Sequence, residues 1–205
     1  ADSDTLTMTG TTVPGWATFT ASTGVLAGTP LNADVGDNSV VITASDGNGG
    51  SVTDSFTIAV ANTNDAPTIT STAVTAVNED AAYSYTVTTN DVDSGDTVTL
   101  TGTTVPSWAT FTASTGVLAG TPDNDDVGDH SVVITASDGT ASVTDSFTIA
   151  VANTNDAPTI TSTAVTSATE DAAYTYTVTA ADVDSGDTVT LTGTTVPGWA
   201  TFTAS

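Results

Sequence analysis

Apolar and polar residues alternate along most of the chain, in short runs separated by turn residues. The run 82–89 is typical, since its odd positions up to 87 are Tyr, Tyr and Val while most of its even positions are Ser or Thr. A period of two places successive side chains on opposite faces of a β-strand. No segment shows a convincing helical period, so the pattern predicts an all-β protein.

Seven such runs follow one another within one stretch of the chain: 67–75, 82–89, 97–103, 108–112, 116–121, 130–137 and 143–151. Turn residues separate them at intervals typical of an immunoglobulin-like sandwich. The inward-facing positions predict a core of Tyr83, Tyr85, Val98, Leu100, Val132, Ile134, Phe147, Ile149 and Val151. We therefore expect a β-sandwich of about seven strands.

The chain repeats itself. The stretch from Trp16 to Pro30 returns letter for letter from Trp108 to Pro122, and begins a third time at Trp199. We expect a partial domain at 1–65, a complete domain at 66–156 and a second partial domain at 157–205. Tandem arrays of small domains usually span distance rather than catalyse a reaction.

The charge is extreme and of one sign: 24 acidic residues, no Lys and no Arg, for a net charge of −24. Binding to nucleic acid is excluded because phosphate contacts need basic side chains. No apolar run is long enough to span a bilayer, so membrane insertion is not expected. The absence of Cys excludes disulfides and thiolate metal sites.

The inventory of side chains also argues against an enzyme. His130 is the only histidine, and the first copy has Asn38 at the same place. A Ser-His-Asp set cannot be assembled in every copy, and the paired carboxylates lie in repeated loops rather than in one cleft. We expect His130 to be a surface residue.

Acidic and Asn residues gather in three repeated loops. Asn-Thr-Asn-Asp-Ala-Pro occupies 62–67 and 153–158, and Asp-Val-Asp-Ser-Gly-Asp occupies 91–96 and 182–187. A third motif, Ala-Ser-Asp-Gly, carries Asp138. Calcium takes six to eight hard oxygen ligands, which short Asp and Asn side chains and backbone carbonyls supply. The loops therefore predict Ca²⁺ as the cofactor.

These motifs resemble a known family. The run 40–67, with Ala-Ser-Asp-Gly, a long strand and the Asn-rich linker, resembles the end of a cadherin repeat. Pro-x-Trp-x-x-Phe, followed by Ser-Thr-Gly and Gly-Thr-Pro, resembles the bacterial dystroglycan-type cadherin-like or immunoglobulin-like repeats of surface adhesins. The resemblance covers all three copies and implies calcium at the junctions between domains.

The resemblance also implies a set of metal ligands. At the first junction it implies Asn62, Asn64, Asp65, Asp91, Asp93 and Asp138; at the second, Asn153, Asn155, Asp156, Asp182 and Asp184. Glu79 is either a ligand reaching the preceding junction or a loop acid, and Glu170 is its counterpart. The linker is one Asn shorter than the cadherin form and an Asp-Arg-Glu motif is absent, so we expect one or two ions per junction.

An ordinary structural explanation competes with each assignment, because Asp, Asn and Gly are also the usual residues of turns. We expect Asp54, Asp80 and Asp96 to be turn or strand-edge residues, and 123–129 to be a solvated loop. Trp16, Trp108 and Trp199 fit core anchors better than sugar-binding platforms.

The sequence thus predicts part of an extracellular adhesin stalk or fibre on a bacterial surface, whose partners are neighbouring repeats of the same chain. Two alternatives remain open. One is a carbohydrate-binding module of a secreted polysaccharide-degrading enzyme. The other is a subunit of a self-assembling filament whose copies meet head to tail.

Overall fold

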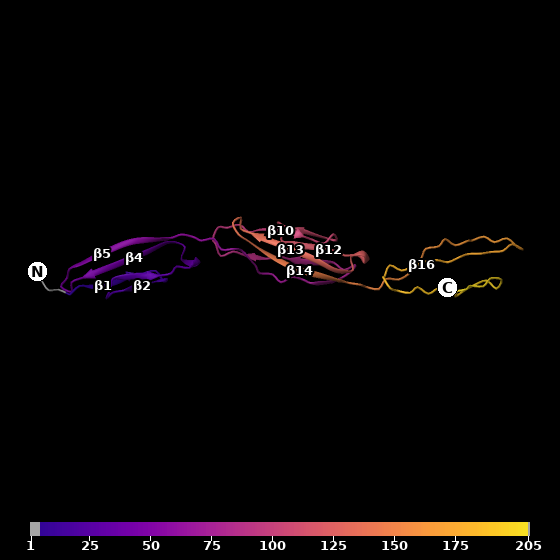
Figure 1. The fold of residues 1–205 in the computed structure, drawn as a ribbon, viewed down its shortest axis with the longest axis horizontal. Coiled ribbons are helices and arrows are strands. Elements are labelled where there is room, and N and C mark those ends of the chain that lie inside the picture. Colours follow the sequence, from indigo (N-terminus) through magenta and orange to yellow (C-terminus); the bar gives the residue numbers. More distant parts are fainter. Residues whose placement is uncertain (1–4, 205) are drawn as a thin grey trace. The chain divides into compact units, whose positions relative to one another are not determined.

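The computed structural model describes residues 5–204, which form strands, turns and two 3₁₀ turns without any α-helix (Figure 1). Thr, Val and Ile suit a pleated, half-buried surface, which explains the choice of strand over helix. The described residues divide into two compact units. The first comprises residues up to Ile69 together with Thr89–Thr99 and Ala136–Val143, and the second comprises Thr70–Thr88, Leu100–Thr135 and Thr144 onward.

The first copy of the repeat lies entirely in the first unit. Its sheet has the order β1-β4-β5, and a separate hairpin joins β2 to β3. The bounds are β1 Thr7–Thr12, β2 Ala17–Thr20, β3 Val25–Gly28, η1 Asn32–Asp34, β4 Gly36–Ser45 and β5 Ser51–Val60. β4 and β5 pair antiparallel along their whole length, from Gly36 opposite Val60 to Ser45 opposite Ser51. Figure 1 shows them side by side.

The central copy forms a four-stranded sheet in the order β10-β13-β14-β7 and a three-stranded sheet in the order β11-β12-β8. Its elements are β6 Thr68–Ile69, β7 Ala76–Asn78, β8 Tyr83–Thr86, β9 Thr89–Asn90, β10 Thr99–Thr104, β11 Ala109–Thr112, β12 Val117–Gly120, η2 Asn124–Asp126, β13 Gly128–Ser137 and β14 Ser142–Ala152. In the third copy, β15 Thr159–Ile160 pairs with β16 Ala180–Ala181.

The core of the central copy lies where the inner faces of these strands meet. Leu118, Ile134 and Ile149 are fully buried, and the rings of Tyr85 and Phe147 pack edge to face at 5.5 Å. Tyr83 is buried too, and its desolvation, followed by the nearby Tyr85, raises its pKa to about 12. The inward positions predicted from the alternation at Tyr83, Tyr85, Val132, Ile134, Ile149 and Val151 are confirmed.

The first strand of the central copy differs from the expectation of one continuous strand over 67–75. β6 pairs antiparallel with β9, while β7 pairs parallel with β14. Between them, Ser71 Oγ accepts the backbone N–H of Thr88 at 3.0 Å and lies 2.9 Å from the Tyr85 hydroxyl. These side-chain contacts replace the ladder where the chain leaves one strand partner for the other.

His130 is not the surface residue that the sequence predicted. It is half-buried, with its ring edge-on to Trp108 at 5.8 Å and its Nε2 2.6 Å from the carbonyl of Asp126. In the first copy, Asn38 takes this place and accepts the Trp16 indole N–H at 3.1 Å. Each polar side chain fills the space beside a tryptophan, which explains why the position is enclosed.

Replacing Leu118 by Ala is expected to destabilise the central copy by about 2–5 kcal/mol, since it removes methyl groups from a site with no solvent access. Leu26→Ala is the matched control, because β3 and β12 have the same sequence but Leu26 is only half-buried. Hydrogen exchange of each strand in denaturant would measure the two losses. Equal losses would contradict the difference in burial.

Candidate metal centres at the two linkers

The first linker, residues 62–67, is held by acidic loops of the central copy within the first compact unit. The backbone N–H of Asp65 donates to Asp93 Oδ2 at 2.6 Å. The side-chain amide of Asn64 donates to Asp138 Oδ2 at 3.0 Å. Neutral donors of the linker thus satisfy carboxylates that the chain cannot pair with any Lys or Arg.

The loop Asp91–Asp96 folds three carboxylates around one point. The N–H of Asp93 donates to Asp91 Oδ1 at 3.0 Å, and Gly95 has a φ of 106°, which favours glycine. One carboxylate oxygen from each of Asp91, Asp93 and Asp96 lies within 4.8 Å of the others. Asp93 is only 5 % exposed, yet its Oδ1 and the Oδ2 of Asp91 are buried without any hydrogen-bond partner.

The second linker, residues 153–158, repeats this geometry within the second unit. The N–H of Asp156 donates to Asp184 Oδ2 at 2.6 Å, and the amide of Asn153 donates to Asp184 Oδ1 at 3.1 Å. Oxygens of Asp182, Asp184 and Asp187 again lie within 4.8 Å of one another. The linker N–H contact and the group of three carboxylates recur in two separate places, which shows that these two features follow from the repeated sequence.

Glu79 lies at the second linker. The interpretation of Glu79 as a ligand that reaches the preceding junction is therefore wrong. The parallel pairing of β7 with β14 carries it there, because Asn78 lies opposite Ala152 and the N–H of Glu79 donates to the Ala152 carbonyl at 3.0 Å. Its Oε1 accepts the N–H of Thr154 at 2.5 Å.

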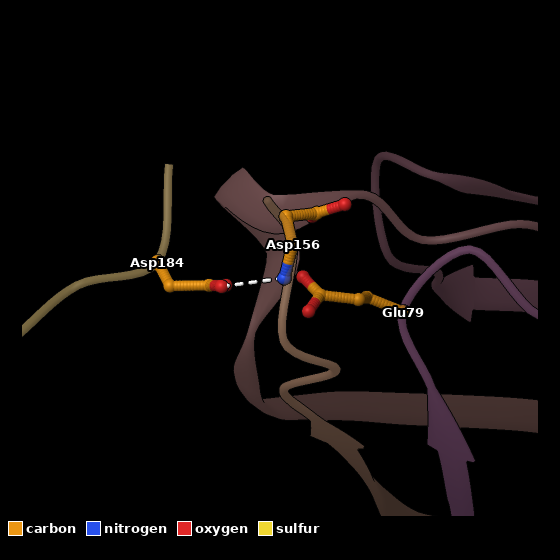
Figure 2. Close-up of side chains that lie close together, drawn as sticks. All are labelled: Glu79, Asp156 and Asp184. Atoms are coloured by element: carbon orange, nitrogen blue, oxygen red, sulfur yellow. Dashed lines mark hydrogen bonds between the residues drawn. The ribbon is translucent and has the colours of Figure 1, made fainter. Parts of the chain in front are cut away.

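The Glu79 carboxylate belongs to a third acidic group. One oxygen each from Glu79, Asp156 and Asp184 lies within 4.8 Å of the others, and Figure 2 shows Glu79 and Asp184 approaching the Asp156 backbone from different elements. Glu79 is 2 % exposed and its Oε2 is buried without a partner. A buried acceptor left unsatisfied costs about 1–3 kcal/mol, and more when it is charged.

The structure also adds two asparagines that the sequence did not single out. Asn124 begins η2, and its side-chain amide donates to Asp156 Oδ2 at 3.0 Å. Asn32 begins η1 and donates to Asp65 Oδ2 at 2.7 Å. The run 123–129 was expected to be a solvated loop. The only available signal was that an Asn recurs at this place in both copies.

Other predicted residues are not brought into these clusters. Within the part of the chain that the structure describes, Asn62 makes no hydrogen bond to an acidic side chain, and the amide of Asn155 donates only to the carbonyl of Asp156. Glu170 is exposed, and it lines a cavity with Tyr174 and Trp199 rather than contacting the linker. Asp96 and Asp187, by contrast, belong to the acidic groups, and Asp96 also closes a turn as expected, since its N–H donates to the carbonyl of Asp93 at 3.3 Å.

Asp138 shows how the linker changes the electrostatics of a loop. Its Oδ1 accepts the N–H groups of Ala141 and Thr140, each at 2.6 Å. The bond to Ala141, then that to Asn64, then that to Thr140 hold the pKa of this carboxyl below its ordinary value. The loop therefore favours the ionised carboxylate even without a cation nearby.

The donor set fits a hard divalent cation. Every candidate atom is an oxygen, and the partnerless ones are buried in a chain that has no Lys or Arg: Glu79 Oε2, Asp91 Oδ2 and Asp93 Oδ1. Calcium tolerates irregular sets of carboxylate, amide and carbonyl oxygens, whereas magnesium demands near-ideal octahedral geometry. The residues present therefore suit calcium.

Comparison with known families agrees with the fold. The family model described as "Putative Ig domain" matches residues 1–61 and 66–152, and the chain belongs to this family of immunoglobulin-like domains. The expected all-β, immunoglobulin-like and cadherin-like fold is confirmed. Among solved structures, protocadherin gammaB7 EC3-6 aligns with a TM-score of 0.52 and 21% identity, over 90% of this chain and 50% of that one.

Two further relatives differ in what they support. The "Serine-rich adhesin for platelets" of Staphylococcus aureus strain MRSA252 is 30% identical over 146 residues, which are 68% of this chain but only 10% of that protein. An endo-fucoidan hydrolase of glycoside hydrolase family 107 is 33% identical and covers 74% of this chain and 24% of that one. Its TM-score of 0.40 is too low to support an inference about fold or activity.

Within residues 5–204, no helix is long and apolar enough to cross a membrane.

Replacing Asn64 by Ala is expected to raise the pKa of the Asp138 carboxyl while leaving it below the ordinary value, because the Ala141 donor remains. A depressed pKa stabilises the folded state above the ordinary value near 3.8, and this contribution is lost as the pH falls through the folded-state pKa. An NMR titration of the side-chain carboxyl carbons in chelator would measure the change. Asn155→Ala, the counterpart in the second linker, should leave Asp138 unchanged; a pKa unaltered by Asn64→Ala would contradict the assigned contact.

Proposed function

We propose that this chain is part of the structural repeat region of a bacterial surface adhesin, in which calcium at the linkers stiffens the connection between successive modules. The modules are 1–65, 66–156 and 157–205. The observation that carries the proposal is the pair of buried carboxylates, Glu79 and Asp93, which keep an unpartnered oxygen beside a linker. The similarity to a staphylococcal adhesin supports the cell surface as the location and neighbouring repeats as partners.

Different acidic residues hold different parts of the two linkers. Asp93 and Asp184 anchor the linkers through the N–H groups of Asp65 and Asp156. Glu79 holds the start of the second linker through Thr154. Because carboxylates about 4–5 Å apart repel by roughly 1–4 kcal/mol per pair at effective dielectric constants between those of water and of a protein surface, each cluster opposes its own closure. A bound divalent cation would supply the positive charge that the chain lacks.

The environment sets the affinity that such a site needs. Extracellular calcium modules bind with Kd values of about 10⁻⁴–10⁻³ M, which match calcium outside cells. The clusters at these linkers combine partly exposed acids, such as Asp96 and Asp187, with the buried ones. Their openness to solvent favours weak, reversible binding over the tight binding of a cytosolic buffer.

A carbohydrate-binding role has less support. Trp108, the residue that would stack on a sugar in the complete copy, packs edge-on against Tyr83 at 5.6 Å, and its indole N–H is buried. Trp199 is 67 % exposed, but it makes the same edge-on contact with Tyr174 at 5.6 Å. The repeated contact is that of a core anchor.

Calcium at millimolar concentration is expected to stabilise the chain by about 1–2 kcal/mol per bound ion, since ligand binding to the folded state alone shifts the equilibrium by that amount at several times the Kd. Differential scanning calorimetry with calcium and with chelator would show a higher Tm in calcium. Asp93→Asn and Asp184→Asn keep the acceptor for the linker N–H but remove charge, so each should lose part of that gain.

Asp54→Asn is the control for these variants, because Asp54 is an exposed residue of β5 outside the acidic groups. It should retain the full response to calcium. A wild-type Tm that is the same in calcium and in chelator would contradict the calcium proposal.

Small-angle scattering provides a test of stiffening that does not depend on stability. If the linkers close around calcium, the distributions of the maximum dimension and of the radius of gyration should be narrower in calcium than in chelator. The reason is that carboxylate repulsion in the ion-free linker favours many open conformations. Identical scattering curves in the two buffers, from a chain that binds calcium, would contradict the mechanical role.

A further inference from the structure

Asn124 and Asn32 are the first residues of the two 3₁₀ turns, and each contacts the linker that follows its own copy. The contacts form in different compact units, so neither depends on the other. The motifs at 62–67, 91–96 and 136–139 do not include these residues. Their placement therefore needs an explanation beyond the acidic loops.

The 3₁₀ turn fixes Asn124 in place before any ion is considered. Asp126 Oδ2 accepts the N–H of Asp123 at 3.1 Å, and the N–H of Asp126 donates to the Asp123 carbonyl at 2.9 Å. The N–H of Asp80 donates to the Pro122 carbonyl at 2.8 Å, which joins this turn to the loop that carries Glu79. A side chain held on such a turn is pre-organised for a contact at the linker.

The amide of Asn124 has one end occupied and one end free. Its Nδ2 donates to Asp156 Oδ2, and this bond fixes which end is the oxygen. Its Oδ1 is buried and has no hydrogen-bond partner. The nearly fully buried Glu79 also has a partnerless oxygen, and it shares Asp156 as a neighbour. Two unsatisfied acceptors from separate elements beside one carboxylate point to a cationic ligand.

We propose that Asn124 is a neutral oxygen ligand of the second linker's cation: its Nδ2 holds Asp156 in place and its Oδ1 completes a site with Glu79, Asp156 and Asp184. Asn32 makes the matching contact at the first linker, where its side-chain amide donates to Asp65 Oδ2. This inference rests on the proposed calcium function and adds to it a neutral amide ligand from outside the acidic loops. An amide in this place supplies an oxygen without another negative charge.

The neutral amide has a physical consequence for affinity. A carboxylate at position 124 would lie about 3 Å from Asp156 Oδ2 and would repel it, whereas the amide attracts it. Calcium affinity in proteins rises with the number of charged ligands. Asn124 therefore keeps the linker cluster together when no ion is bound and limits the affinity when one is.

Isothermal titration calorimetry of calcium into the 205-residue chain tests this role with two substitutions of opposite effect. Asn124→Asp should tighten binding at the second linker several-fold and lower the Tm in chelator, since it adds a ligand charge and removes the amide donor. Asn124→Ala should weaken binding several-fold. Asn48→Asp, at an exposed hairpin tip, adds the same charge away from the linkers and should change neither quantity by as much as twofold.

The results would differ if Asn124 only held the linker through its hydrogen bond to Asp156 and did not bind the cation. In that case the Asn124→Asp variant would bind calcium no more tightly than the wild type, and its Tm would be lowered equally with and without calcium. That result would overturn the ligand role. Near-ultraviolet circular dichroism of the tryptophans checks that each variant is folded.

Different results would contradict the proposed function and the role of Asn124. A wild-type chain that shows no heat of calcium binding and no calcium-dependent Tm would sink the proposed function and this role with it. A wild-type chain that binds calcium, with Asn124→Asp and Asn124→Ala variants of unchanged affinity, would sink only the role of Asn124.

Discussion

The linkers are governed by a shortage of positive charge. With 24 acids and no Lys or Arg, enclosed carboxylates depend on neutral N–H and O–H donors of the protein. The linkers supply such groups from Asp65, Asn64 and Thr154, and the 3₁₀ turns add Asn32 and Asn124. These donors are too few for the acceptors, so one buried oxygen each of Glu79 and Asp93 has no hydrogen-bond partner.

The sandwich delivers these groups by strand pairing rather than by sequence proximity. β7 runs parallel to β14, so Glu79 at the end of β7 emerges beside the residues that follow Ala152. β6 pairs with β9, which places the start of the central copy beside the loop that begins at Asp91. Acids from opposite ends of the copy thus reach different linkers. This explains why a repeat with one acidic composition produces two separate clusters.

The alternation of residues predicted most strands and the central core, because burial on one face imposes a period of two on a strand. The repeated motifs also predicted that Asp93 meets its linker. Neither interpretation of Glu79, as a ligand at the preceding junction or as a loop acid, placed it at the second linker, because its place in the sequence says nothing about a switch of strand partner at Ser71. Asn124 was missed because Asn in an acidic run is also an ordinary turn residue. His130 was misjudged because its enclosure depends on Trp108, which is distant in sequence.

The pairing that positions Glu79 also links the acidic cluster to the stability of the sheet. The Glu79 N–H donates to the carbonyl of Ala152, the last residue of β14, and its Oε1 accepts the N–H of Thr154, just beyond that strand. Whatever orders the second linker must therefore hold β7 against β14, and fraying of β7 must release Glu79 from the linker. Thermodynamic linkage makes this coupling equal in both directions. A mechanical load that pulled on the linker would thus reach the sheet through the same carboxylate that an ion would hold.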